Sequence, residues 1–293
     1  MHDAAYYIDL LLSGVTVGSL YALIAIGYTM VYGILRLINF AHGDIFMMAG
    51  FFMVYAATWM PMAVCIPLVL IATVALGVLI EKAAYSPLRT APRMSVMISA
   101  IGVSYLLQSL AQLVFGSEMH SFPKMIDIPA IKLGELTIKG DALATLAVSA
   151  LIMVALTLFI GKTRMGKAMR AVSEDKDAAE LMGISVNKTI SVTFAIGSAL
   201  AAVAGIFYGS TYGFIGPYTG SMPGIKAFVA AVFGGIGSIP GAMIGGLALG
   251  VIENLAKAYI STELSDAIVF GVLIVVLLCK PTGLLGKKIK EKV

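Results

Sequence analysis

Long apolar runs dominate this chain and constrain its fold more than any other feature. Several exceed about 18 residues, the length that crosses a bilayer core of roughly 30 Å as a helix. Hydrophobic residues make up 59% of the 293 residues and charged residues 12%, a composition that excludes an ordinary soluble domain. We therefore expect an all-α polytopic membrane protein.

Seven runs are expected to cross the membrane as full helices. They cover residues 8–35, 43–59, 62–81, 94–116, 142–161, 188–213 and 264–280. The first run lacks a basic segment and a clear cleavage site, so it reads as a retained span and not as a signal peptide. Residues 1–293 are expected to form a single transmembrane domain.

The positions of lysine and arginine predict the orientation of these spans. The first nine residues contain neither, whereas Arg36, then Lys82 and Arg89, then the stretch 162–188 follow the first, third and fifth spans. Four lysines between Lys287 and Lys292 follow the last span. Because cytoplasmic loops carry the positive charge, we expect the N-terminus and loop 117–141 outside, and loop 162–188 and the C-terminus in the cytoplasm.

The segment 223–253 does not read as one simple span. Two apolar pieces of about 10 residues flank the sequence GGIGSIPG, and each would cover only about half of the bilayer. We expect a re-entrant pair of half-helices, since irregular backbone at membrane depth is tolerated where it is buried in protein or lines a wet cavity. A broken helix buried for packing alone is the alternative. The pathway residues predicted here are Lys226, Gly234, Gly235, Gly237 and Ser238.

Polar residues also interrupt the apolar sequence within LRLINFAHGDIF, residues 35–46. Polar groups inside a membrane are costly and point to function by default. In a helix, Asn39 and His42 would lie on nearly the same face and Asp44 would point away. We predict that Asn39 and His42 line the pathway; a position at the cytoplasmic surface, where they would cost little, is the alternative.

The stretch Arg164–Lys188 is polar and carries both signs of charge. Ser173 suits a helix N-cap, and Gly183 suits a left-handed helix end with Ile184 packing back. We expect about two and a half helical turns, too short to be stable alone. A protein groove is the expected support, with lipid headgroups as the alternative. The residues predicted for docking are Arg170, Asp175, Asp177, Ala178, Ala179, Gly183 and Ile184.

Patterns for catalysis are missing from the sequence. Gly161 begins a Gly-Lys-Thr like the end of a phosphate-binding loop, but Leu156 stands where its first glycine is needed. The three histidines lack metal-ligand spacing, and both cysteines lie in apolar segments. We expect no catalytic residue, metal or cofactor on this chain and no nucleic-acid partner, so energy would come from a partner subunit or an ion gradient.

The docking segment resembles a known motif. DAAELMGI, residues 177–184, is similar to the EAA loop of ABC importer permeases, with Asp177 where the motif has Glu. Four further stretches resemble the branched-chain amino acid permease family and its LivH-type branch. They are Gly18–Gly50, Tyr85–Pro92, Ile225–Gly246 and Lys280–Lys287. The resemblance therefore extends from about residue 10 to 287.

This resemblance implies an ATP-driven importer of Leu, Ile or Val with a type II-like permease architecture, in the cytoplasmic membrane of a bacterium or archaeon. The implied partners are a homologous LivM-type permease, one or two kinds of ABC ATPase that bind ATP and Mg²⁺, an extracytoplasmic binding protein, and lipid. An ABC importer of urea, short amides or other amino acids is the alternative. A gradient-driven carrier would leave the docking segment unexplained.

Overall fold

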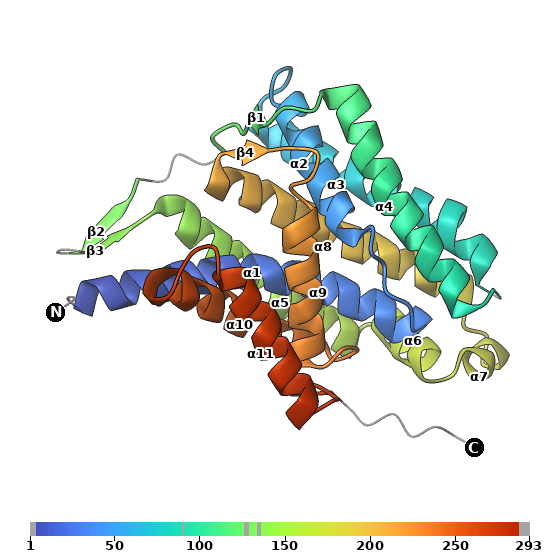
Figure 1. The fold of residues 1–293 in the computed structure, drawn as a ribbon. Helices are drawn as coiled ribbons and strands as arrows, with labels where there is room; N and C mark the ends of the chain where they lie inside the picture. Colours follow the sequence, from blue (N-terminus) through green and yellow to red (C-terminus); the bar gives the residue numbers. More distant parts are fainter. Residues whose placement is uncertain (1–3, 90, 126–128, 134–135, 287–293) are drawn as a thin grey trace.

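A computed structural model of the chain describes residues 4–89, 91–125, 129–133 and 136–286, and these are mostly helical (Figure 1). The helices are α1 (Ala4–Leu35), α2 (His42–Ala56), α3 (Met62–Ile80), α4 (Arg93–Phe115), α5 (Gly140–Lys162), α6 (Arg164–Glu174), α7 (Lys176–Leu181), α8 (Val186–Tyr212), α9 (Ser221–Gly234), α10 (Ile239–Tyr259) and α11 (Ser265–Cys279). A π-helical turn, η1 (Glu81–Tyr85), and a 3-10 turn, η2 (Ser86–Leu88), follow α3.

Short antiparallel strands pair in two places outside the helices. β1 (His120–Ser121) pairs with β4 (Phe214–Ile215), and β2 (Ile131–Leu133) pairs with β3 (Leu136–Ile138). The first pair joins the segment after α4 to the segment after α8, so both helices finish at the same end of the molecule. All four strands lie in connections and leave the helical class unchanged.

Six helices among the described residues are long and apolar enough to cross a membrane: α1, α3 with its following turns, α4, α5, α8 and α10. This confirms a polytopic helical membrane protein. The count of seven full spans is not confirmed, because the predicted spans 43–59 and 264–280 correspond to α2 and α11, which have 15 residues each.

α1 is the central helix of the bundle. In its most apolar window 72% of the residues are buried, against 28% for α3 and α5 and 22% for α4. α10 packs against α1 through small residues, since a Cβ added at Gly18 would lie 2.8 Å from the backbone of Leu247. Such glycine contacts let two helix backbones approach closely. The more exposed α3, α4 and α5 form outer surfaces.

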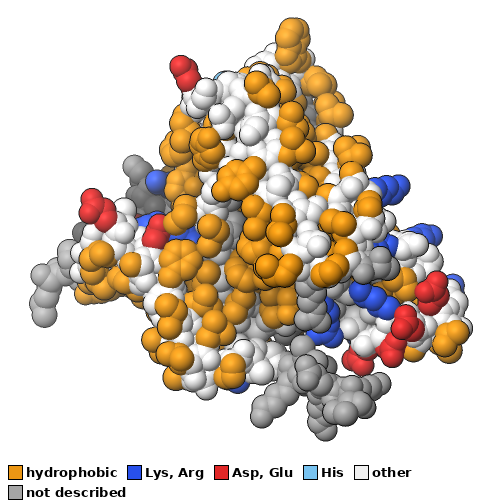
Figure 2. Space-filling model, turned by 45° about the vertical axis from the view of Figure 1, so that its right-hand side comes forward, with side chains coloured by type: hydrophobic (Ala, Val, Ile, Leu, Met, Phe, Trp, Pro, Cys, Tyr) orange, Lys and Arg blue, Asp and Glu red, His pale blue; other side chains and the backbone are white. Residues whose placement is uncertain are grey.

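The two ends of the bundle differ in what they carry (Figure 1). α6 and α7 lie where α1 finishes, and the Arg36 guanidinium donates to the carbonyl of Ser173 at 3.1 Å. The β2–β3 hairpin lies at the opposite end, beside the start of α1. We call these the α6–α7 end and the N-terminal end. Figure 2 shows a mostly hydrophobic face on which charged side chains gather toward the edges.

The predicted pair of half-helices at 223–253 is not confirmed. α9 is short, with 14 residues, but α10 has 21 residues, continues past Glu253 to Tyr259 and is long enough to cross a membrane. The turn between them lies at the α6–α7 end, because Gly237 and Ile239 line a groove with Arg170 of α6. Helix α10 can continue through a charged residue because Glu253 is neutralised by neighbours inside the bundle.

Candidate functional site

The polar stretch after α5 folds as two helices that separate at Asp175. The extended backbone of Asp175 (φ −153°, ψ 112°) ends α6, and its Oδ1 accepts a hydrogen bond from the Ala178 N–H at 3.0 Å to cap α7. The prediction of Ser173 as the cap is wrong, because its hydroxyl donates to the Arg170 carbonyl inside α6 at 2.7 Å. α7 therefore has six residues, fewer than the two and a half turns expected.

Gly183 ends α7 in the left-handed conformation that the sequence predicts, with φ +79°. The Gly183 N–H donates to the Glu180 carbonyl at 2.9 Å, and the Ile184 N–H donates to the Ala179 carbonyl at 3.0 Å. This pair of bonds is a Schellman motif, which satisfies the last carbonyls of the helix. It fixes the direction in which the chain leaves α7 and enters α8.

α7 presents apolar side chains to its surroundings. Leu181 is 89% exposed and Met182 is 82% exposed, while Asp177 and Ala178 are also exposed and Ala179 is buried. Exposed apolar side chains rimmed by polar residues are typical of a protein–protein contact. The docking role of this helix stays a prediction.

Basic side chains lie close to the first turn of α7. Partial burial lowers the pKa of Lys176, the guanidinium groups of Arg89 and Arg36 lower it further, and Asp177 opposes them. Arg89 itself pairs with the buried Glu81 of η1 and donates to Asn187 of α8. The end of α1, the turns after α3 and α7 therefore meet in one positively charged region.

A small groove at the α6–α7 end brings together residues predicted for two different roles. Arg170 and Met169 come from α6, Gly33 comes from α1, and Gly237 comes from the turn between α9 and α10. The sequence places Arg170 in the docking set and Gly237 in the pathway set. Arg170 of α6 and Gly237 of the α9–α10 turn thus line the same groove.

That turn is also covered by the C-terminal segment 280–286. The Leu284 N–H donates to the Phe233 carbonyl at 2.9 Å, and the Leu285 N–H donates to the Gly234 carbonyl at 2.8 Å. Gly235 has φ +109°, and a Cβ added there would overlap the backbone of Gly286. The lysines from Lys287 onward lie outside the described residues.

Ser238 begins α10 on the other side of the same turn. Its side-chain oxygen accepts a hydrogen bond from the Gly241 N–H at 3.2 Å and so caps the helix. Gly234 packs directly against Gly241, because a Cβ on either one would overlap the backbone of the other. The predicted residues Gly234 to Ser238 thus form a tight, capped turn at the α6–α7 end.

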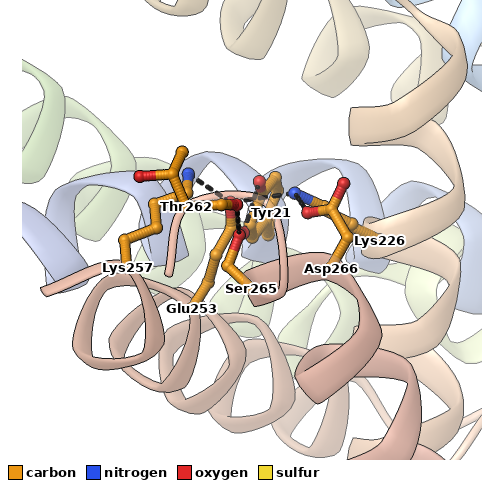
Figure 3. A network of polar contacts seen from close by, with 7 residues as sticks. All are labelled: Tyr21, Lys226, Glu253, Lys257, Thr262, Ser265 and Asp266. Atoms are coloured by element: carbon orange, nitrogen blue, oxygen red, sulfur yellow. Dashed lines mark hydrogen bonds and ion pairs between the residues drawn. The ribbon is translucent and has the colours of Figure 1, made fainter. Parts of the chain in front are cut away.

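Lys226 lies in a network of polar contacts between four helices (Figure 3). Its Nζ is 2.8 Å from Oε1 of Glu253 in α10 and 2.6 Å from Oδ1 of Asp266 in α11. Glu253 also pairs with Lys257 at 2.6 Å and accepts a hydrogen bond from the Tyr21 hydroxyl of α1 at 2.8 Å. We call these five residues the Lys226 cluster.

Sequence reasoning identified Lys226 but missed the rest of the cluster. Glu253 closes the predicted segment 223–253 and was given no role there, yet it is buried at 1% exposure. One signal was available: Glu253 and Lys257 stand four residues apart and can pair on one helix face. Asp266 comes from another helix, and no local pattern connects it to Lys226.

Asn39 and His42 are both 1% exposed, so the alternative position at the surface is wrong. The Tyr85 hydroxyl donates to Oδ1 of Asn39 at 2.6 Å, and the His42 ring lies 4.8 Å from the Tyr28 ring in an edge-to-face contact. Among the described atoms, Nδ2 of Asn39 and Nε2 of His42 lack hydrogen-bond partners. Asn39 precedes α2, so the two residues do not share a helix face.

Asp44 was expected to point away from the pathway residues, yet it is also buried, at 2% exposure. Its Oδ1 accepts a hydrogen bond from Nε2 of Gln108 in α4 at 2.9 Å. The same amide nitrogen is 3.5 Å from Oγ of Ser221, the first residue of α9. Helices α2, α4 and α9 therefore meet through polar side chains inside the bundle.

Comparison with known proteins shows the family of this chain. Residues 10–277 match the sequence profile described as the branched-chain amino acid transport system / permease component. This chain belongs to that family. The profile covers most of α1, all of the helices from α2 to α10, and most of α11.

Curated relatives in this permease family match over the whole chain. The high-affinity branched-chain amino acid transport system permease protein LivH of Salmonella typhimurium is 47% identical, with 98% of each chain covered. LivH of Escherichia coli K12 is 46% identical over the same shares. BraD of Pseudomonas aeruginosa, described in the same words, is 44% identical over 100% of both chains.

Similarity to solved structures is weaker. A chain of PsaBC from Streptococcus pneumoniae aligns over 95% of this chain and 91% of its own length, with a TM-score of 0.45 and 12% identity. A likeness at this level carries no argument about fold or function.

Proposed function

We propose that this chain is a permease subunit of an ATP-driven importer of the branched-chain amino acids Leu, Ile and Val. The observation that carries the proposal is full-length similarity, at 44–47% identity, to LivH and BraD permease proteins of branched-chain amino acid transport. An aliphatic side chain needs an apolar route through the bilayer, and this bundle offers mainly apolar surface.

In this proposal α7 is the coupling helix. Leu181 and Met182, both more than 80% exposed, enter a groove of an ATPase subunit, as an apolar helix face does in helix-in-groove recognition. The exposed Asp177 forms part of the polar rim. One or two kinds of ATPase subunit would bind ATP and Mg²⁺, and this chain would bind neither.

Movement of α7 would reach the pathway through α6. α6 packs against α1, and its Arg170 lines one groove with Gly33 of α1 and Gly237 of the α9–α10 turn. Closure of the ATPase subunits would shift α6 and change how α9 packs. A ligand or partner drives such a change only by binding one arrangement better than the other.

The orientation follows from charge. The α6–α7 end carries Arg36, Arg89, Lys176 and the other basic residues of loop 162–188, so we place it in the cytoplasm by the positive-inside rule. The N-terminus and loop 117–141 then face outward, where an extracytoplasmic binding protein delivers substrate. The C-terminus faces the cytoplasm.

The translocation pathway would lie between this chain and a second, LivM-type permease in a type II-like arrangement. The pathway residues proposed on this chain are Asn39, His42, Lys226, Gly234, Gly235, Gly237 and Ser238. Unpartnered polar atoms at Asn39 and His42 support a role that changes between conformations, because an orphaned buried polar group costs about 1–3 kcal/mol.

Uptake into proteoliposomes tests the proposal. We expect the transporter, reconstituted with its second permease, ATPase subunits and binding protein, to accumulate leucine only when ATP and Mg²⁺ are supplied to the ATPase side. Uptake driven by an ion gradient without ATP would contradict an ABC importer. Uptake of urea or short amides in place of Leu, Ile and Val would contradict the substrate assignment.

A charge reversal tests the coupling assignment. Asp177→Lys should uncouple ATP hydrolysis from uptake while the chain remains in the membrane, because it reverses the charge beside the docking face. Glu263→Lys reverses an exposed charge at the N-terminal end and should leave coupling unchanged. Normal coupled uptake by the Asp177 variant would refute the assignment of α7.

A further inference from the structure

Three carboxylates are buried among the described residues, and one of them lacks a cationic partner. Glu81 pairs with Arg89, and Glu253 pairs with Lys226 and Lys257. Asp44 is 2% exposed and takes part in none of the ion pairs of the described residues. A buried charge is normally paired, since an uncompensated one costs several kcal/mol. Asp44 is therefore the carboxylate that needs a further explanation.

The neighbours of Asp44 are polar but neutral. Nε2 of Gln108 donates to Oδ1 of Asp44 at 2.9 Å and lies 3.4 Å from Oγ of Ser104 and 3.5 Å from Oγ of Ser221. Asp44 stands in the first turn of α2, where the positive end of the helix dipole favours the ionised form. The donors to Asp44 are the Gln108 amide and the Ser104 hydroxyl, and both are neutral.

Asp44 lies within the depth of the bundle. The adjacent His42 contacts Gly27 of α1, which lies eight residues, or roughly 12 Å, from the end of that helix. Gly43 packs so closely on Gly220 that a Cβ on either would overlap the other's backbone. The start of α2 and the start of α9 therefore meet at membrane depth, with Asp44 beside the junction.

A row of polar side chains on α4 extends outward from Asp44. Ser104, Gln108 and Gln112 are spaced by four residues and share one face. Gln112 donates to the Tyr218 hydroxyl at 2.6 Å. The opposite face carries Leu106 and Leu113, which are 56% and 82% exposed. A polar row on a membrane helix normally faces protein or a water-filled cavity.

We propose that Asp44 binds the α-ammonium group of the amino acid during its passage, and that the Ser104–Gln108–Gln112 face of α4 forms a polar wall of the pathway. This inference rests on the proposed importer function and names its substrate-contacting carboxylate. The ammonium group offers three N–H donors and a full positive charge, whereas Gln108 and Ser104 offer Asp44 only neutral donors. Gln108 gives way to the ammonium group as α4 and α9 move apart.

The ammonium site is tested by measuring leucine uptake in the complete transporter after the negative charge at position 44 is removed or moved to position 108. Asp44→Asn keeps the shape of the side chain and its contact with Gln108 but removes the negative charge. Leucine uptake should fall by at least about ten-fold, because a charge-assisted contact is lost. The double variant D44N/Q108E returns a carboxylate to the same hydrogen bond and should recover much of the uptake. Wild-type uptake in D44N, or a loss that the double variant leaves unchanged, overturns the ammonium site.

Thiol labelling tests the polar wall without depending on which substrate is carried. In a background with Cys65→Ser and Cys279→Ser, cysteines at Ser104 and Gln112 should react with methanethiosulfonate ethylammonium at least about ten times faster than cysteines at Leu106 and Leu113. Equal rates at the two pairs overturn the proposal, even in a transporter that imports leucine normally. If the wild type imports no branched-chain amino acid, the proposed function fails. The labelling rates still show whether water reaches the Ser104–Gln108–Gln112 face of α4.

Discussion

At the scale of single residues, Glu253 connects the Lys226 cluster, since three side chains converge on its carboxylate. Glu253→Ala would leave Lys226 buried with Asp266 as its remaining carboxylate partner. We expect it to lower the free energy of unfolding by about 3 kcal/mol, the typical penalty for breaking a buried pair. Thermal unfolding of the purified protein in detergent measures the effect.

Asp266→Asn provides the matched control for Glu253. Asp266 contacts the same lysine, but its side chain is 39% exposed, so its removal should cost about 1 kcal/mol or less. An equal decrease in the free energy of unfolding for both variants would show that burial does not determine how much each carboxylate stabilises the protein. A Glu253 loss below about 1 kcal/mol would contradict its central role.

The left-handed backbone conformation of Gly183 disfavours any other residue at this position. At φ +79° an alanine costs about 1–2 kcal/mol, although a Cβ there would meet no neighbour. Gly183→Ala should therefore speed hydrogen exchange of the α7 amides. Gly271→Ala also meets open space but lies in the α-helix α11, where alanine is preferred, so it should leave α7 unchanged. Equal exchange in both variants would contradict the strain argument.

At the scale of elements, the segment 280–286 completes α9. Two of its N–H groups satisfy the last carbonyls of the helix at Phe233 and Gly234, which would otherwise lack partners. Truncation after Cys279 should speed hydrogen exchange in the last turn of α9 and lower the unfolding temperature. Truncation after Gly286 retains both bonds and serves as the control. Equal protection of α9 in the two truncations would mean that the segment does not support the helix.

Helices and their ends could be predicted from the sequence where neighbouring residues alone determine them. The end of α7 at Gly183 follows from a residue that tolerates a left-handed conformation, and the long apolar runs predicted five of the six candidate spans. α10 was expected as a half-helix because its apolar run of about 10 residues stops before the charged residues Glu253 and Lys257. Their neutralisation depends on Lys226, which lies 27 residues from Glu253 in sequence. Local patterns cannot reveal a charge pair made between helices.

The candidate site illustrates the same limit. Asn39, His42 and Lys226 were identifiable because polar residues stand out in apolar sequence. Asp44 was set aside because a helical reading of residues 39–44 turns it away from Asn39 and His42, whereas α2 begins only at His42. Its relation to Gln108 depends on how α2 packs against α4, 64 residues later in the chain. That packing is a property of the whole bundle.

At the scale of the whole molecule, the two ends are chemically different surfaces joined by α1. The α6–α7 end combines exposed apolar side chains on α7 with the basic residues Arg36 and Arg89. The groove at Gly33 and Arg170 connects this surface to the bundle interior. A partner bound to α7 would be linked through α6 to α1, the helix that contributes Tyr21 to the Lys226 cluster.

In the proposed arrangement, assembly of the transporter depends on the apolar tip of α7. Leu181→Arg places a charge on the 89% exposed apolar tip of α7, where a buried contact with an ATPase subunit would have to desolvate it. We expect the ATPase affinity to fall by about 30-fold or more, corresponding to a hot-spot loss of about 2 kcal/mol. Quantitative co-purification of the ATPase subunits with the permease measures this.

Met119→Arg controls for the general effect of an added surface charge. Met119 is also apolar and 64% exposed, but it lies beside β1, toward the end of the molecule away from α7. It should leave ATPase binding unchanged, because the ATPase contacts only the α6–α7 end in this arrangement. Loss of ATPase from both variants would point to a disturbed bundle. Retention of ATPase by the Leu181 variant would mean that α7 is not the docking helix, and the partner would then have to bind the basic surface around Arg36 and Arg89.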